Sequence, residues 1–182
     1  MNNNKTKKTL LLVASIFLLI SNFKHNHKQK KLITYGTFDL FHHGHQKLFD
    51  NMVNLLGKDV KIYVGISSDE FNLIKNKKAV DSFETRSNNV KKHPNVVETF
   101  IENNWNQKTS DIKRINPDFF IMGSDWTGKF DELKKFCKVI YLPRTPKISS
   151  TILREKRELY SKNTKQLTPP SLKLCINLSA FT

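Results

Sequence analysis

Two histidines lie three residues apart in the first polar loop of the chain, and their spacing suits a phosphate site. His42 and His45 come shortly after an apolar run that ends at Gly36, and Gly44 stands between them. At the start of a helix, Gly44 would let the backbone approach an anion closely, where free N–H groups attract negative charge. Residues three apart share one side of a helical turn, so both imidazoles can point to the same triphosphate. This loop therefore predicts a polyphosphate site.

A second polar stretch, RTPKISST, follows the last apolar run and begins at Arg144. The arginine offers a fork that can hold two phosphate oxygens, and Ser149, Ser150 and Thr151 offer hydroxyls at a predicted helix N-terminus. Read alone, such a run of hydroxyls is typical of an ordinary helix cap. Together with the histidine loop, it predicts that both stretches bind one triphosphate.

The elements that position these loops alternate between strands and helices. Such alternation predicts an α/β fold, a Rossmann-like doubly wound parallel sheet with helices on both faces in a single domain. Ligands bind beyond the carboxyl ends of the strands in such sheets, so the loops after strands should form the site. We expect strands at 31–35, 60–66, 96–101, 118–122 and 139–142, and helices from the histidine loop to 56 and at 69–78, 83–92, 107–115, 129–136 and 150–160.

The stretch GTFDLFHHGH at 36–45 resembles the signature of the cytidylyltransferase family, an HxGH motif after a G-T-F-D turn, and RTPKISST resembles the second signature of that family. The family's histidines stabilise charge that develops on the α-phosphate and on the departing pyrophosphate, so neither has to act as a base. The resemblance implies direct in-line attack by a phosphate oxygen on the α-phosphorus of CTP. It gives catalytic roles to His42, His45, Lys77 and Arg144, and nucleotide contacts to these four and to Thr37, Phe38, Asp39, Gly44, Asp125, Thr145, Ile148, Ser149, Ser150 and Thr151.

Three further stretches resemble the branch of the family that acts on glycerol 3-phosphate. They are DEFNLIKNKKA at 69–79, NWNQK at 104–108 and MGSDWTGKFDELK at 122–134. The resemblance leaves other phosphorylated acceptors open, among them ethanolamine phosphate, choline phosphate, sugar phosphates and flavin mononucleotide. It implies acceptor contacts from Lys75, Lys108, Trp105 and Arg86, the last as either a phosphate contact or a structural residue.

Three departures from the family pattern leave a catalytically impaired relative as an alternative. Lys147 stands where the family has glycine, which matters if the backbone there needs a positive φ. Ser124 replaces an aspartate. The stretch SNNVKKHPN at 87–95 replaces an apolar helix, so Pro94 and the asparagines should fray or shorten the helix.

Mg²⁺ should accompany CTP as the cofactor. The pattern contains no dense carboxylate cluster, so we expect no set of protein ligands for a metal and assign the ion to phosphate oxygens and water. Asp39 is the best protein candidate to steer the ion, and its alternative role is to cap a turn. The two cysteines, Cys137 and Cys175, are too few for a disulfide framework or a zinc site.

Composition predicts a soluble globular protein, with 38% hydrophobic and 26% charged residues among 182. The net charge of +15 leaves a nucleic-acid or membrane-surface binding protein as an alternative. Ten of the 31 basic residues lie in acid-free ends at 1–31 and 161–182, however, so the middle of the chain has a net charge of only +5. We therefore expect CTP and a small phosphorylated alcohol as partners and no nucleic acid, and the family implies a homodimer.

Both ends lie outside the expected domain at 31–160. Residues 1–30 form a basic and apolar leader, in which the apolar run Leu10–Ile20 is about half as long as the roughly 20 residues that span a bilayer. This leader is typical of a signal-like or weakly membrane-associating segment, or of upstream translation. We expect the domain in the cytoplasm, including the cytosolic face of a membrane, and a flexible tail at 161–182.

Overall fold

Parallel strands form a single five-stranded sheet in the computed structural model, which describes residues 11–15 and 29–167. The strands are β1 (Lys31–Gly36), β2 (Lys61–Ser67), β3 (Val96–Glu102), β4 (Phe119–Gly123) and β5 (Lys138–Leu142). They lie in the order β3-β2-β1-β4-β5, and all neighbouring pairs are parallel. The direction of winding reverses between β1 and β4, and the crevice at the carboxyl ends of these two strands is where such sheets bind ligands.

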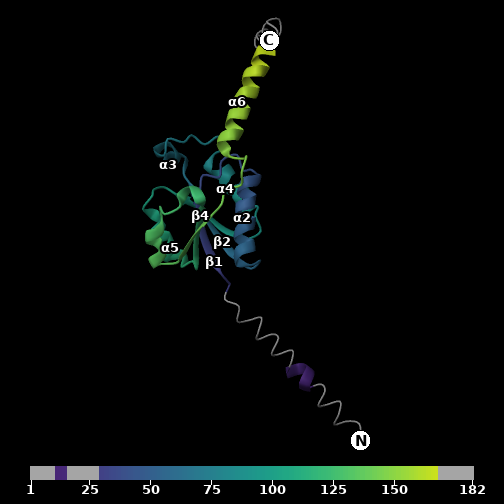
Figure 1. The fold of residues 1–182 in the computed structure, drawn as a ribbon, viewed down its shortest axis with the longest axis vertical. Coiled ribbons are helices and arrows are strands. Elements are labelled where there is room, and N and C mark those ends of the chain that lie inside the picture. Colours follow the sequence, from purple (N-terminus) through teal and green to yellow (C-terminus); the bar gives the residue numbers. More distant parts are fainter. Residues whose placement is uncertain (1–10, 16–28, 168–182) are drawn as a thin grey trace, which may run out of the picture.

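Helices cover both faces of the sheet, which confirms the predicted architecture (Figure 1). Neighbouring residues of β1 face two different cores: Leu32 packs with residues of α2 and α4, whereas Ile33 packs with residues of α5 and η2. The helices are α2 (His43–Leu56), α3 (Asp69–Ile74), α4 (Phe83–Lys91), α5 (Gln107–Ile115) and α6 (Ser150–Leu167), with the 3-10 helices η1 (Ser124–Trp126) and η2 (Asp131–Lys135).

The helix after the histidine loop is anchored to the sheet by one apolar stripe. Phe49, Met52 and Leu56 of α2 are buried, and their spacing of three and four residues places them on one side of the helix. Because this stripe packs against β1 and β2, the first turn of α2 is held at the carboxyl end of β1. The position of His42 and His45 therefore follows from the packing of α2.

The helix predicted at 129–136 is wrong, because this segment forms only the short 3-10 helix η2. Phe130 and Leu133 are both buried and lie three residues apart, which suits a helix with three residues per turn. Tyr141 of β5 also holds the segment: its hydroxyl accepts a hydrogen bond from the Phe130 N–H at 3.1 Å and donates one to Asp131 at 3.0 Å.

Two other helix ends differ from the prediction for local reasons. The helix at 69–78 ends early, at Ile74, because Asn76 adopts a left-handed conformation with φ 54° and the Lys77 N–H turns back to the Asn72 carbonyl at 2.8 Å. In contrast, α4 is not frayed. Ser82 caps it by accepting a hydrogen bond from the Thr85 N–H, and Pro94 lies beyond its end.

The last helix projects away from the sheet (Figure 1). It continues past Tyr160, where the prediction ended it, because the first proline after Ser150 that could stop it is Pro169. Among the described residues, no helix combines the length and the apolar character that crossing a membrane requires. Most of the predicted leader at 1–30 and the end of the predicted tail, 168–182, lie outside the described residues.

Candidate active site

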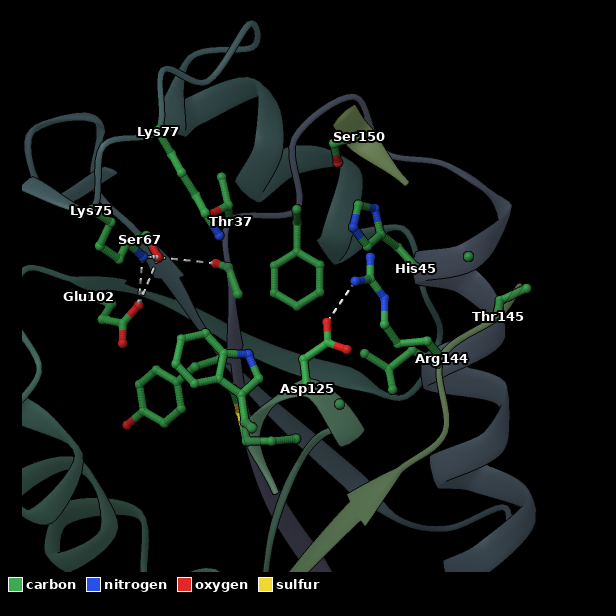
Figure 2. A pocket seen from close by; sticks show the side chains of 18 of the residues that line it. Thr37, His45, Ser67, Lys75, Lys77, Glu102, Asp125, Arg144, Thr145 and Ser150 are labelled. Atoms are coloured by element: carbon green, nitrogen blue, oxygen red, sulfur yellow. Dashed lines mark hydrogen bonds and ion pairs between the residues drawn. The ribbon is translucent and has the colours of Figure 1, made fainter. Parts of the chain in front are cut away.

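A cavity opens at the carboxyl ends of β1 and β4, where the winding of the sheet reverses (Figure 2). Gly36 and Gly123, the last residues of these strands, both line it. Both signature loops and the predicted acceptor lysines therefore border the same space. The lining residues that the sequence predicts are Thr37, Phe38, His42, Gly44, His45, Lys75, Lys77, Trp105, Lys108, Asp125, Arg144, Thr145, Ile148 and Ser150.

His42 caps α2 and holds His45 beside it. The Nδ1 atom of His42 accepts a hydrogen bond from the Gly44 N–H at 3.1 Å, and Nδ1 of His45 accepts a longer one from the His42 N–H at 3.4 Å. The two imidazole rings stack, with centroids 3.8 Å apart. Because each Nδ1 atom accepts, the hydrogen of each neutral ring lies on Nε2, and that atom becomes a donor.

Both imidazoles are neutral at pH 7 when no ligand is bound. Burial lowers the pKa of His45 to about 3, with further contributions from repulsion by a protonated His42 and by Arg144. Burial also lowers the pKa of His42, with further contributions from Arg144 and His43. A neutral ring with an occupied Nδ1 atom can donate through Nε2 but has no free lone pair for a proton. The pair therefore fits an electrostatic role better than that of a general base.

The two signature loops meet at Gly44. A Cβ atom at this position would lie 2.9 Å from Cγ2 of Ile148, which is closer than real contacts allow. Nearby, the Ser150 hydroxyl donates a hydrogen bond to the Asp39 carbonyl oxygen at 2.7 Å. Glycine is needed here because the loops approach so closely. Both stretches therefore border one cavity, which the predicted binding of a single triphosphate requires.

Lys147 occupies a backbone position that favours glycine. Its φ is 63°, in the left-handed region, so the position needs the positive φ that the sequence comparison raised as a concern. A residue with a Cβ atom in this conformation costs about 1–2 kcal/mol. Ile148 and Ser150, which follow Lys147 in the loop, both line the cavity.

Replacing Lys147 with glycine should raise the Tm by about 2–4 °C. Glycine adopts φ 63° without this strain, which stabilises the folded state. Glycine also makes the unfolded chain more flexible, which offsets part of the gain, so the net increase in the free energy of unfolding is about 0.5–1 kcal/mol. Differential scanning calorimetry measures the shift. Lys147→Ala is the matched control, because it removes the same side chain but keeps the Cβ atom, and its Tm should stay at the wild-type value. Equal shifts for both variants would contradict the argument.

Arg144 and Lys77 bring positive charge to the cavity. Arg144 donates to Oδ2 of Asp125 at 2.6 Å, and both side chains are about half exposed, so the guanidinium is held at the edge of the cavity and remains hydrated. Figure 2 shows His45, Arg144 and Ser150 on one side of the cavity and Lys75 and Lys77 on the other, with the end of the Lys77 side chain pointing toward the middle. We call the first side the histidine side and the second the lysine side.

Buried charged groups form the lysine side. Lys108 and Glu102 are each only 3% exposed, and Lys108 Nζ donates to Oε1 of Glu102 at 2.5 Å. Ser67 Oγ donates to Oε2 of Glu102 at 2.7 Å and accepts from Lys75 Nζ at 2.6 Å. Burial lowers the pKa of Lys75 to about 8, against the opposing effect of the Glu102 carboxylate. Two cations and one anion thus share a poorly hydrated space.

Sequence reasoning missed part of the lysine side. Ser67 and Glu102 are the last residues of β2 and β3, so the rule that ligands bind at the carboxyl ends of strands could have found them. The aromatic residues that line the cavity were harder to predict from the sequence, because an aromatic residue is more often part of a hydrophobic core. The remaining lining residues outside the prediction are Tyr35, Gly36, Leu48, Met122, Gly123, Trp126, Phe130 and Pro143.

Arg86 is fully buried and does not line the cavity. Its Nη1 atom donates to the Thr37 carbonyl at 2.7 Å, its Nε atom to the Asp81 carbonyl at 3.1 Å, and its Nη2 atom to Asp69 Oδ1 at 2.5 Å. Of the two roles that the sequence allowed, these contacts are those of a structural residue. Arg86 ties the lysine-rich loop that follows α3, residues 75–81, to the histidine loop.

Asp39 also lies behind the cavity wall. Its Oδ1 atom accepts hydrogen bonds from the N–H groups of Val80 and Asp81, both at 3.0 Å, as a turn-capping aspartate does. Its buried Oδ2 atom has no hydrogen-bond partner in the part of the chain that the structure describes. Within the same residues, no group of three or more His, Cys, Asp or Glu side chains could hold a metal ion. Oxygen atoms are the ligands that Mg²⁺ prefers, and a triphosphate bound in the cavity would supply them.

Two of the three predicted hydroxyls serve the helix instead of the cavity. Ser149 Oγ accepts a hydrogen bond from the Ile152 N–H at 3.2 Å, and Thr151 Oγ1 accepts one from Arg154 at 3.3 Å. Neither residue lines the cavity, whereas Ser150 does. The alternative interpretation, that this run of hydroxyls is an ordinary helix cap, thus holds for Ser149.

Comparison with known proteins agrees with the geometry. The profile of the cytidylyltransferase-like family matches residues 33–156. The chain is 51% identical to a glycerol-3-phosphate cytidylyltransferase of Bacillus spizizenii over 126 residues, which are 69% of this chain and 95% of that protein. It is 50% identical to a glycerol-3-phosphate cytidylyltransferase of Bacillus subtilis over 127 residues, which are 70% of this chain and 96% of that protein. A lipopolysaccharide core biosynthesis protein from Thermoplasma volcanium GSS1 shares the fold, with a TM-score of 0.53 at 15% identity over 64% of this chain and 98% of that one. This chain belongs to the cytidylyltransferase-like family.

Proposed function

We propose that the protein transfers a cytidylyl group from CTP to sn-glycerol 3-phosphate, giving CDP-glycerol and diphosphate. The observation that carries the proposal is one cavity with two unlike sides, in which both signature loops border the histidine side and two lysines border the other. The two Bacillus relatives support the choice of acceptor.

The reaction proceeds by direct in-line attack. An oxygen of the acceptor phosphate forms a bond to the α-phosphorus of CTP, the bond from that phosphorus to the oxygen bridging it to the β-phosphate breaks, and pyrophosphate leaves with the electron pair. A phosphate monoester is mostly a dianion at pH 7, since its second pKa is about 6, so the attacking oxygen needs no base. This requirement agrees with histidines that are neutral and whose Nδ1 atoms already accept hydrogen bonds.

The histidine side stabilises the charge that develops during this step. His42 and His45 donate from Nε2 to oxygens of the triphosphate, and Arg144 and Lys77 neutralise the departing pyrophosphate. The Gly44 loop brings backbone N–H groups at the start of α2 to the same phosphates. Mg²⁺, bound by the phosphate oxygens of CTP, would neutralise part of their charge.

The lysine side holds the acceptor. Lys75 binds the phosphate of the acceptor, and Lys108 and Trp105 bind the rest of the molecule. Lys75 and Lys77 are two residues apart on one loop and both line the cavity, so a triphosphate bound by Lys77 would lie beside an acceptor phosphate bound by Lys75. Such an arrangement would bring the attacking oxygen next to the α-phosphorus.

The affinity for the acceptor should fall as the pH rises above about 8. Burial lowers the pKa of Lys75 from 10.5 to about 8, and the protonated form binds phosphate, so deprotonation removes the attraction. We expect kcat/KM for glycerol 3-phosphate to fall about tenfold per pH unit above this value. Steady-state kinetics over a pH series measures it. In Lys75→Arg the arginine stays protonated over this pH range, so the dependence of kcat/KM on pH should be flat. A flat wild-type profile up to about pH 10 would refute the assignment.

The proposed reaction is tested with the purified full chain, CTP, MgCl₂ and one phosphorylated acceptor at a time. Pyrophosphate release is measured, and the product is identified by mass spectrometry. We expect release with glycerol 3-phosphate and much less with ethanolamine phosphate or choline phosphate. Release with a different acceptor alone would replace glycerol 3-phosphate in the proposal, and release with none would indicate an impaired relative.

We propose a homodimer and a cytoplasmic location for the catalytic domain as parts of the same function. The edge strand β3 exposes Val97 and Ile101, and an exposed apolar edge favours pairing with a second chain. Light scattering should then give twice the chain mass of 21.2 kDa.

The proposed location of the catalytic domain is the cytoplasm because CTP is supplied there. Weak membrane association through residues 1–30 is tested by vesicle sedimentation of the full chain and of a variant that begins at Lys31.

A further inference from the structure

We infer that Glu102 selects a hydroxylated acceptor: its carboxylate, together with Ser67 and Lys108, binds the hydroxyl groups of glycerol 3-phosphate. This inference rests on the proposed function and refines it, because it states which end of the acceptor lies where. The acceptor phosphate lies toward Lys75 and Lys77, and the hydroxyl end lies deeper, against Glu102.

Glu102 is a buried carboxylate in the wall of a cavity, which is an uncommon place for an acid. Only 3% of the residue is exposed. Its two oxygens offer about four positions for hydrogen-bond donors. Lys108 occupies one position on Oε1 and Ser67 occupies one on Oε2, while Lys75 Nζ lies 3.9 Å from Oε2. Each oxygen therefore keeps a position at which a substrate hydroxyl can donate.

The charges on the lysine side separate the two ends of the acceptor. Lys108 lies 2.5 Å from Glu102, so these two charges largely cancel at close range. A phosphate dianion placed against Glu102 would bring two anions together in a poorly hydrated space, which is unfavourable. Lys75 instead donates to the neutral Ser67 hydroxyl, so its charge remains available to a phosphate. Figure 2 shows Lys75, Ser67 and Glu102 linked in this way.

The walls around Lys108 make a missing hydroxyl costly. Lys108 Nζ lies 4.6 Å, 5.1 Å and 5.2 Å from the ring centroids of Tyr35, Trp105 and Phe130. The hydroxyl of Tyr35 donates to Asp111 at 2.9 Å, so its proton is not available to substrate hydroxyls as the polar groups of Glu102, Ser67 and Lys108 are. Aromatic rings cannot replace a lost hydrogen bond. An acceptor without hydroxyls would therefore bury Glu102 and Ser67 without partners for their remaining hydrogen-bond positions, which is how a polar pocket discriminates.

The first test uses the wild-type protein and three acceptors that differ only in hydroxyl number: glycerol 3-phosphate, 3-hydroxypropyl phosphate and propyl phosphate. We expect kcat/KM to fall about tenfold to hundredfold for each hydroxyl removed. If all three acceptors react equally well, the inference is overturned while the proposed function stands. If none of them reacts, the proposed function itself fails.

The second test compares Glu102→Gln with Glu98→Gln, a matched control on the same strand whose side chain is 38% exposed and pairs with Arg114. For Glu102→Gln we expect kcat/KM to fall about thirtyfold with glycerol 3-phosphate, mainly through KM, and to change less than about threefold with propyl phosphate or in KM for CTP. Glu98→Gln should match wild type with every acceptor. Equal losses of Glu102→Gln with all acceptors would mean that Glu102 merely holds Lys108, and would overturn the inference. If Glu102→Gln does not fold, Ser67→Ala replaces it. We then expect kcat/KM of Ser67→Ala to fall with glycerol 3-phosphate and to change little with propyl phosphate, and equal losses with all acceptors would overturn the inference.

Discussion

The variant His45→Ala should lose about 10²- to 10³-fold in kcat while its KM for CTP changes only a few fold. In the proposed reaction the Nε2–H group of His45 donates to an oxygen on which negative charge grows, and removing one such donor typically costs this much. The loss falls on kcat because the hydrogen bond strengthens in the transition state. Pyrophosphate release at saturating CTP and acceptor measures it.

His43→Ala is the matched control for this prediction. His43 belongs to the same helical turn, but its side chain is exposed and does not line the cavity. Its kcat and its KM for both substrates should therefore equal the wild-type values. A His45→Ala enzyme with nearly wild-type kcat, or equal losses in the two variants, would refute the role given to the His45 donor.

Adding one methyl group at Gly44 should lower kcat/KM by at least about 10²-fold. In Gly44→Ala the new Cβ atom would lie 2.9 Å from the His42 ring and 2.9 Å from Cγ2 of Ile148, so the His42 ring and the Ile148 side chain have to shift. Displacing catalytic groups by about 1 Å is enough for a loss of this size. The overpacking should also cost about 1–3 kcal/mol of stability. Steady-state kinetics and thermal unfolding measure the two effects.

Gly123→Ala controls for the methyl group itself. A Cβ atom at Gly123 would have no atom within 4 Å, so this variant should unfold at the wild-type Tm. If Gly44→Ala kept wild-type kinetics, the close approach of the loops would not matter for the reaction. If Gly123→Ala were destabilised as strongly as Gly44→Ala, the loss of glycine flexibility, rather than crowding, would explain both.

The fold and the histidine side could be predicted because their signals are local. Apolar runs separated by helical patterns predicted the parallel sheet, and His42, Gly44 and His45 lie within one turn of chain after a strand. The short helix η2 could not be predicted in this way, because Phe130 and Leu133 are spaced three apart and this spacing fits both α-helices and 3-10 helices.

The lysine side was harder to predict because its residues meet only in the folded sheet. Ser67 and Glu102 end neighbouring strands, and they come together because β2 and β3 pair in parallel with Ser67 opposite Glu102. A motif also does not reveal whether a side chain faces the cavity or supports it from behind. The resemblance implies contacts for both Arg86 and Asp39, yet both of them lie behind the wall.

The buried ties behind the wall have a consequence for how substrates associate. Arg86 joins the histidine loop to the lysine-rich loop, and Asp39 joins both of these to Ser150 of the second signature. The three segments are thus already fixed relative to one another when CTP arrives. Little conformational entropy remains to be lost on association, so contacts with the triphosphate contribute to affinity instead of to ordering the protein.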